Sequence, residues 1–302
     1  MARQADVRRG IPLALGAGVL LGIGTPLEKG LVSRMDPVAL AGVLYMGPAI
    51  ILALVVLTRS RHQAYVRVTR LDVPRLVLAV LTGTILAPVL LMYGIRFSSG
   101  FGASLMLNME ALATALIAWA FFRERVSPLI WLAIACMTIV GVLVTGHEGL
   151  GSSPVLGAVL ILGTSVCWGI ETNIVTTLST RDPLLITLIE CVPAAVILTG
   201  LGIVRTGGLS PVHELLLATL LGFICNGAGL LLFFFSLRTM GAARTAAFAG
   251  VGPLAGALVS LVLFRTPITW SVLVALGLTA AAVFVVGRDG GRQSLAWEAT
   301  ER

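Results

Sequence analysis

Ten apolar stretches of about 20 residues follow one another along this chain, with only short polar connections between them. About 20 residues is the length that an α-helix needs to cross the hydrocarbon core of a bilayer. Hydrophobic residues make up 57% of the 302 residues and charged residues 12%, so a soluble fold would lack the polar groups to cover its surface. The sequence therefore predicts an all-α membrane protein with ten transmembrane helices, at 11–31, 37–58, 74–96, 99–122, 127–145, 155–178, 183–204, 212–237, 241–264 and 268–287.

The two halves of the chain resemble each other. EALATALIAWAFFRERV at 110–126 matches GPLAGALVSLVLFRTPI at 252–268, an offset of 142 residues. Because five helices is an odd number, the second copy must start on the opposite side of the membrane, so the repeats are inverted. We predict two inverted five-helix repeats, the first at 1–148 and the second at 149–288, followed by a short cytoplasmic tail at 289–302.

Glycines four residues apart occur in the first and ninth predicted helices. They are the pairs Gly18/Gly22 and Gly252/Gly256. Small residues at this spacing allow two helix backbones to approach closely. We therefore expect close helix packing at both pairs.

The basic residues are unevenly divided between the two sides of the predicted bundle. If the N-terminus faces the cytoplasm, 16 of the 21 Lys and Arg side chains lie on the cytoplasmic side and five on the other. Short cytoplasmic loops of membrane proteins carry this excess of positive charge. The sequence thus predicts an integral protein of the cell (inner) membrane with both termini in the cytoplasm.

Several function classes find little support in the sequence. The net charge of +7 is spread over short loops rather than gathered with aromatic residues into a patch for nucleic acid. The four cysteines and three histidines stand in no metal-ligand spacing, and no HExxH, GxSxG or phosphate-loop motif occurs. We therefore expect no metal, no soluble cofactor, no nucleic-acid partner and no enzyme activity.

Polar side chains inside the predicted spans need a reason to be there, because an ionised group in hydrocarbon costs at least about 2.5–3.5 kcal/mol. The functional interpretation is that they line a central cavity, where a buried carboxyl group can load and release a proton and amides or aromatic rings can contact a solute. The alternative is that they hydrogen-bond neighbouring helices and fix their packing. The candidate residues are Glu110, Asn108, Glu171, Asn173, Glu190, Trp168, Tyr45, Tyr93 and Asn226.

A further carboxylate, Glu28, lies near the outer end of the first predicted helix beside Lys29. Long side chains at such a position can extend to the membrane interface. Both residues are therefore expected at the interface, and a functional role for Glu28 in the cavity is the alternative.

Segments of both halves resemble the drug/metabolite transporter superfamily, specifically its EamA-type ten-helix permeases. The first half carries GTPLEKGLVSRMDPVALAGVLYMG and ASLMLNMEALATALIAWAFFRERVSPLIW, and the second carries SVCWGIETNIVTTLSTRDP and LRTMGAARTAAFAGVGPLAGALVSLVLF. The resemblance covers nearly the whole chain and implies the ten-helix fold. One departure is Thr266, where the repeat would be expected to echo Glu124.

The resemblance and the duplicated spans together predict a secondary transporter. It would move a small metabolite, an amino acid or similar solute, out of the cell by alternating access around a central cavity, with Glu110 as the first candidate for proton coupling. An uncoupled facilitator or exchanger fits the same residues, and an intramembrane enzyme or a non-transporting receptor is a more distant alternative. The expected partners are the solute, the bilayer and protons, and a homodimer is left open.

Overall fold

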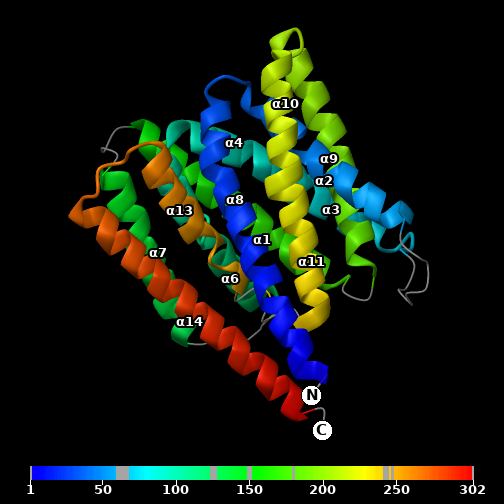
Figure 1. Cartoon of the computed structure of the whole chain (residues 1–302), viewed down its shortest axis with the longest axis vertical. Helices are drawn as coiled ribbons and strands as arrows, with labels where there is room; N and C mark the ends of the chain where they lie inside the picture. The colour runs from blue at the N-terminus through cyan, green and yellow to red at the C-terminus, as the bar shows by residue number, and fades with distance from the viewer. Residues whose placement is uncertain are drawn as a thin grey trace.

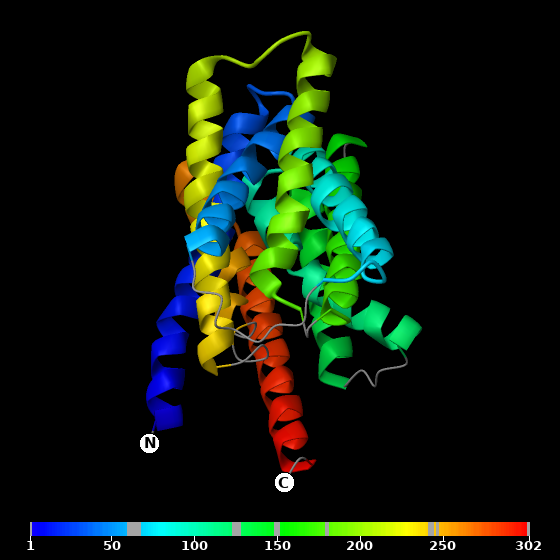
Figure 2. The same cartoon turned by 90° about the vertical axis from the view of Figure 1, so that its right-hand side faces the viewer.

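The computed structural model describes residues 2–58, 68–122, 128–147, 152–178, 181–240, 245 and 248–300. Within these residues the fold is built from helices that run between two ends of one bundle (Figure 1). Both termini lie at one end, which we call the terminal end, and the loop between α9 and α10 lies at the other, the distal end (Figure 2).

The helices follow the predicted spans closely. In the first half they are α1 (Ala2–Val32), α2 (Pro37–Thr58), α3 (Val73–Ala79), η1 (Val80–Leu86), α4 (Ala87–Phe97), α5 (Gly100–Met106), α6 (Met109–Phe122) and α7 (Pro128–His147). In the second half they are α8 (Ser152–Thr176), α9 (Pro183–Thr206), α10 (Val212–Leu221), η2 (Gly222–Ala228), α11 (Gly229–Met240), α13 (Gly252–Leu263) and α14 (Trp270–Thr300).

Some helix ends differ from the expectation. Helix α1 begins about nine residues before its apolar run, and α14 continues to Thr300, beyond the run that ends at residue 287. The beginning of the ninth predicted span, at 241–244, lies outside the described residues. By length and hydropathy, the described helices include seven that can cross a membrane and three shorter apolar ones, which is why the chain is an integral membrane protein.

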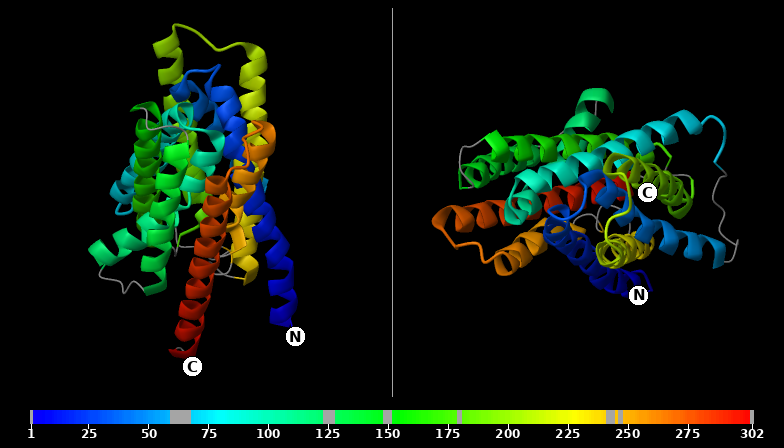
Figure 3. Two further views of the ribbon diagram at one scale, coloured as in Figure 1. Left: turned by 90° about the vertical axis from the view of Figure 1, so that its left-hand side faces the viewer. Right: turned by 90° about the horizontal axis from the view of Figure 1, so that it is seen from above.

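The packing pairs equivalent helices of the two halves. Helix α2 packs on α9, and α7 packs on α14 along one edge of the bundle (Figures 1 and 3). Helix α1 contacts α11 and α13, just as α8 of the second half contacts α4 and α6 of the first. Each half therefore makes the same set of contacts with the other, as two inverted repeats do.

Two of the spans contain a wider turn in the middle. These π-helical segments, η1 and η2, begin at Val80 and Gly222, the same offset of 142 residues that relates the repeated sequences. In η1 the backbone N–H of Ala87 donates to the carbonyl of Thr82, five residues earlier. Pro88 follows and has no N–H to offer, so the regular α-helical pattern cannot continue unbroken through this turn.

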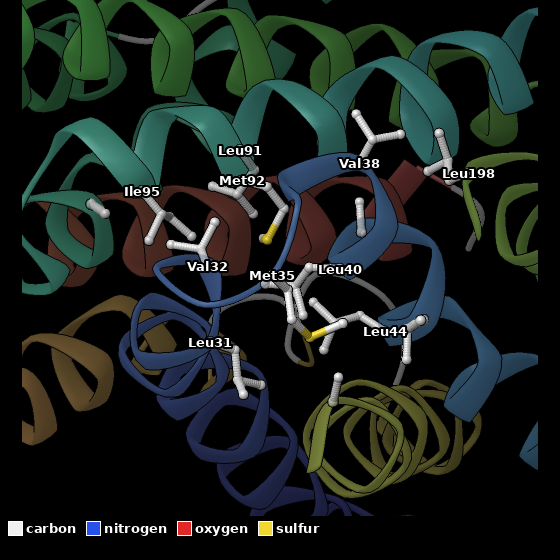
Figure 4. Close-up of a cluster of buried hydrophobic side chains, with 14 of the residues drawn as sticks. Leu31, Val32, Met35, Val38, Leu40, Leu44, Leu91, Met92, Ile95 and Leu198 are labelled. Carbon is white, nitrogen blue, oxygen red and sulfur yellow. The ribbon is translucent and has the colours of Figure 1, made fainter. Parts of the chain in front are cut away.

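The core holds the helices together near the distal end. Figure 4 shows this cluster, in which Leu31 and Val32 at the end of α1 and Met35 in the following turn join side chains of α2 and α4. Further down α1, Gly22 lies directly against the backbone of Gly252 at the start of α13, and Gly256 faces the carbonyl of Gly22. The expected close approach at the paired glycines is thus confirmed.

Candidate functional site

The carboxylate of Glu171 lies against the first π-helical segment. Glu171 is in α8, and its side chain occupies the space that a Cβ would fill at Gly83 in η1. One turn earlier in α8, the indole Nε1–H of Trp168 donates to the carbonyl of Gly83 at 2.9 Å. The second half thus supplies both a carboxylate and a hydrogen-bond donor to the same turn of the first half.

Glu190 lies on the other side of this turn. It is 3% exposed, in α9, and its backbone carbonyl accepts a 3.1 Å hydrogen bond from the hydroxyl of Thr84 in η1. Its carboxylate atom Oε1 is buried without a hydrogen-bond partner. A buried polar atom without a partner costs about 1–3 kcal/mol, more for a charged group, so this oxygen is a candidate to hold a proton or to accept a hydrogen bond from a bound group.

Tyr45 lies among these acidic residues. It is half-buried in α2 and packs with Leu52, Leu184 and Cys191. Its phenol is within electrostatic range of Glu171 and Glu190, and also of Glu28. The structure therefore brings Tyr45, Trp168, Glu171 and Glu190 into one polar region.

Glu110 and its neighbours border this region on the side of α6. The fourth predicted span is broken at residues 107–108, and Glu110 stands in the first turn of α6 directly after the break, within electrostatic range of Glu171. The amide of Asn108 donates to the carbonyl of Leu105 at 3.2 Å, within its own turn. Glu110 therefore sits at a helix start rather than at the middle of a continuous helix.

The side chain of Asn173 makes hydrogen bonds that connect two helices. Its side-chain amide donates to the carbonyls of Thr114 in α6, at 3.1 Å, and of Gly169 in its own helix, at 2.8 Å. These bonds tie α8 to α6. The residue is part of the wall of the polar region, with its N–H groups already engaged.

Glu28 differs from the sequence expectation. It is 5% exposed and hydrogen-bonds the side chain of Asn226 in η2, so it does not extend to the interface. Lys29 instead reaches across to α4 and donates to the carbonyls of Ile95 at 2.7 Å and Arg96 at 3.1 Å. The interface interpretation was wrong for Glu28, because its side chain lies on the face of α1 that packs against the second half.

Glu28 and Glu171 have equivalent surroundings. Each comes from the first helix of one half and meets the π-helical segment of the other half, Glu28 at η2 and Glu171 at η1. Asn226 stands at the position of η2 that corresponds to Thr84 in η1. Asn226 therefore belongs with Glu28 in a second polar region related to the first by the repeat.

Tyr93 lies apart from the other candidates. Its hydroxyl accepts a 3.0 Å hydrogen bond from Arg205 near the distal end, where Arg205 also lies 3.7 Å from the carboxylate of Asp36. Its ring is partly buried and packs against the core cluster that contains Met92 and Ile95. The structure thus places Tyr93 in a contact between the halves at the rim of the bundle.

The sequence interpretation missed Gly83 and Thr84. Neither stands out by charge, and the π-helical turn that positions them is not a feature of hydrophobic periodicity. The signal that could have pointed to this place is Pro88, which interrupts an apolar run. Within the described residues, no group of three or more His, Cys, Asp or Glu side chains is arranged to hold a metal ion.

Comparisons with known proteins agree with this architecture. The sequence pattern of the EamA-like transporter family matches residues 8–146 and again 155–288. An uncharacterized transporter from Methanothermobacter thermautotrophicus is 26% identical over 268 residues, which cover 83% of this chain and 78% of that protein. A crystal structure with 15% sequence identity shares the fold with a TM-score of 0.68, covering 92% of this chain and 95% of the other. The chain is a membrane transporter and belongs to the EamA-like transporter family.

Proposed function

We propose that this transporter exports a small metabolite, an amino acid or similar solute, across the inner membrane, and that the solute moves together with proton exchange at buried carboxylates. The observation that carries the proposal is the unpartnered Oε1 of Glu190, buried beside Glu171. A group of this kind is either protonated or paired with something that enters from outside the chain. Proton exchange and solute binding both meet that need.

The route follows from where the carboxylates stand. Glu110, Glu171 and Glu190 come from α6, α8 and α9, so helices of both halves contribute to one region. A site shared in this way can be exposed to either side when one half moves against the other. Alternating access around these residues, with the boundary between the halves at 148/149 and both termini in the cytoplasm, is therefore the mechanism that we propose.

The test is transport in liposomes. Purified protein is reconstituted, and counterflow of labelled amino acids and related metabolites is measured with and without an imposed pH gradient. We expect flux that responds to the gradient in the wild type and loses that response in Glu190→Gln. The matched control is Glu298→Gln, which removes the same charge near the end of α14 and should leave the response intact.

The result also separates the alternatives. Flux that ignores the pH gradient in the wild type would make the protein a facilitator or exchanger and would contradict proton coupling. A gradient response that survives in Glu190→Gln would show that Glu190 does not carry the proton.

A further inference from the structure

We propose that the transported solute carries a positively charged amino group and that this group replaces the proton on the buried carboxylates. The inference rests on the proposed function and assigns the charge of its substrate. The starting point is that the membrane-spanning helices hold several acidic side chains without an arginine partner among the described residues. Glu28, Glu110, Glu171 and Glu190 all lie in membrane-spanning helices.

Among the arginine side chains that the structure describes, none forms an ion pair with any of these four glutamates. Lys29 points to backbone carbonyls, Arg181 pairs with Asp72, and Arg205 pairs with Asp36. Among the other arginines whose exposure the structure describes, all are exposed: Arg9, Arg34, Arg70, Arg75, Arg96 and Arg265. Since none of the arginine side chains that the structure describes neutralises these carboxylates, we infer that protons or a solute supply the neutralising charge.

The free oxygen of Glu190 indicates which kind of solute fits. An anion would meet carboxylates without a cation to hold it, whereas an ammonium group can donate to the unpartnered Oε1. Tyr45, within electrostatic range of Glu171 and Glu190, adds an aromatic ring that can face a cation. When the ammonium binds, the carboxyl proton leaves to solvent, so the charge of the site is unchanged and the two cations compete.

Proton release measures this competition directly. Protein in detergent at weak buffering is mixed with benzylammonium, benzyl alcohol or benzoate, which have similar shapes and charges of opposite sign or none, and a pH dye follows released protons. We expect release with benzylammonium only, and at least about a fivefold smaller signal in Glu190→Gln. Glu298→Gln serves as the control.

Counterflow of the same three probes in liposomes distinguishes the possible failures. Flux of benzoate or benzyl alcohol without flux of benzylammonium would overturn the charge assignment and leave transport standing. If no solute of any charge moves, the proposed function itself is contradicted. Proton release by benzylammonium that is undiminished in both Glu190→Gln and Glu171→Gln would place the site elsewhere and overturn the inference.

A separate observation concerns the ends of the bundle. At the terminal end, Asp72 before α3 and Arg181 before α9 form an ion pair of 3.0 Å that joins the two halves. The hydroxyl and backbone N–H of Thr69 also donate to this carboxylate, at 2.9 and 2.8 Å. We call this the terminal latch.

The inverted repeat places a matching pair at the distal end. With the offset of 142 residues set by η1 and η2, Asp72 corresponds to Glu214 in the first turn of α10. Arg181 precedes the capping residue Asp182 by one position, and Arg34 precedes the equivalent cap Asp36 by two. Helix α10 packs against α1 and α2, just as α3 packs against α8 and α9.

This distal pair is not formed in the structure. Glu214 is 7% exposed with its Oε2 unpartnered, and its Oε1 lies 3.9 Å from His213. The side chain of Arg34 is exposed and makes no hydrogen bond or ion pair with the described residues. Arg34 directly precedes Met35 in the turn after α1. Leu31 and Met35, both labelled in Figure 4, share a core cluster with Ala218 of α10. The geometry points to Arg34 and Glu214 as a distal latch that closes when the terminal latch opens.

Disulfide cross-linking tests the distal latch without any substrate. In membranes treated with a mild oxidant, Arg34→Cys/Glu214→Cys should cross-link and be released by reductant, whereas Ser33→Cys/Glu214→Cys should react more slowly. Adding Asp72→Asn opens the terminal latch and should raise the cross-linking rate about two- to fivefold. An unchanged rate, or no cross-link in protein that reaches the membrane normally, would overturn the proposal.

A charge swap covers the case in which the cysteine pair does not fold. Arg34→Glu and Glu214→Arg alone place like charges together, and the combined swap restores opposite charges. We expect the swap to recover most of the thermal stability that either single variant loses. Strictly additive losses would contradict a direct Arg34–Glu214 contact.

Discussion

The close contact between α1 and α13 gives a prediction whose size can be worked out. A Cβ at residue 22 would overlap the backbone of Gly252, including its carbonyl oxygen. Backbone atoms cannot rotate away as a side-chain end can, so the two helices must separate. In Gly22→Ala this overpacking costs about 1–3 kcal/mol, offset by about 0.8–1 kcal/mol from the better helix propensity of alanine.

The same helix offers the matched control. Gly30 also lies in α1, but a Cβ there would have no atom within 4 Å. Gly30→Ala therefore keeps the gain in helix propensity, up to about 1 kcal/mol, without the steric cost. The difference between the two variants isolates the overpacking at Gly22.

Thermal unfolding in detergent, followed by intrinsic fluorescence, measures this difference. Each kcal/mol corresponds to about 2–4 °C for a protein approaching this size. We expect Gly22→Ala to melt below Gly30→Ala by several degrees and to transport more slowly, because α1 and α13 belong to different halves. If Gly22→Ala melts at or above Gly30→Ala, the helices are not in backbone contact and the reasoning fails.

Four further changes test individual contacts. Thr84→Val removes the hydroxyl that donates to the Glu190 carbonyl and should lower the stability measured by melting in detergent by about 0.5–1.5 kcal/mol. The control is Thr82→Val, which should change the stability less because the Thr82 hydroxyl bonds only within its own span. Trp168→Phe keeps the ring but loses the bond to Gly83, so solute flux should fall while the protein still folds. Lys29→Met leaves the carbonyls of Ile95 and Arg96 without their donor and should lower the melting temperature, which Lys29→Arg should partly restore. The backbone N–H of Thr69, with Arg181, holds the pKa of Asp72 below its usual value, so the stability that ionised Asp72 contributes is full at neutral pH and is lost as the pH falls below about 4. The melting temperatures of wild type and Asp72→Asn should therefore converge in acid. A constant difference between them would contradict the role given to the Asp72 carboxylate.

Much of the fold was accessible from the sequence because lipid imposes strong constraints. The apolar runs gave the spans, and the paired glycines of α1 and α13 gave a helix contact, since both depend on local composition. The break between α5 and α6 was not foreseen. The run at 99–122 is apolar apart from Ser99, Ser104, Asn108, Glu110 and Thr114, and nothing in its hydrophobic periodicity marks residues 107–108 as the point where the helix stops.

The candidate site was only partly predictable, for a physical reason. A carboxylate in a membrane span signals that something polar surrounds it, which identified Glu171 and Glu190. The sequence does not say which helix face meets which, so Tyr93 could not be separated from Tyr45, and Glu28 was assigned to the interface. Those distinctions depend on long-range packing between the halves.

The π-helical segments have a consequence for how the spans can deform. A π-helical turn contains one residue more than the α-helical turn that it replaces, so each of these two spans carries an extra residue near its middle. If the position of the extra residue shifts from one end of η1 to the other, the helical segments on either side keep their hydrogen bonds. Their rotation about the helix axis relative to each other then changes by up to one residue, about 100°, with a shift of about 1.5 Å along the axis. The two spans that face Glu171 and Glu28 can therefore rotate at mid-membrane without losing their helical hydrogen bonds. Deleting a single residue from 80–86 would remove the extra residue of η1 and prevent this rotation, while leaving α3 and α4 in register.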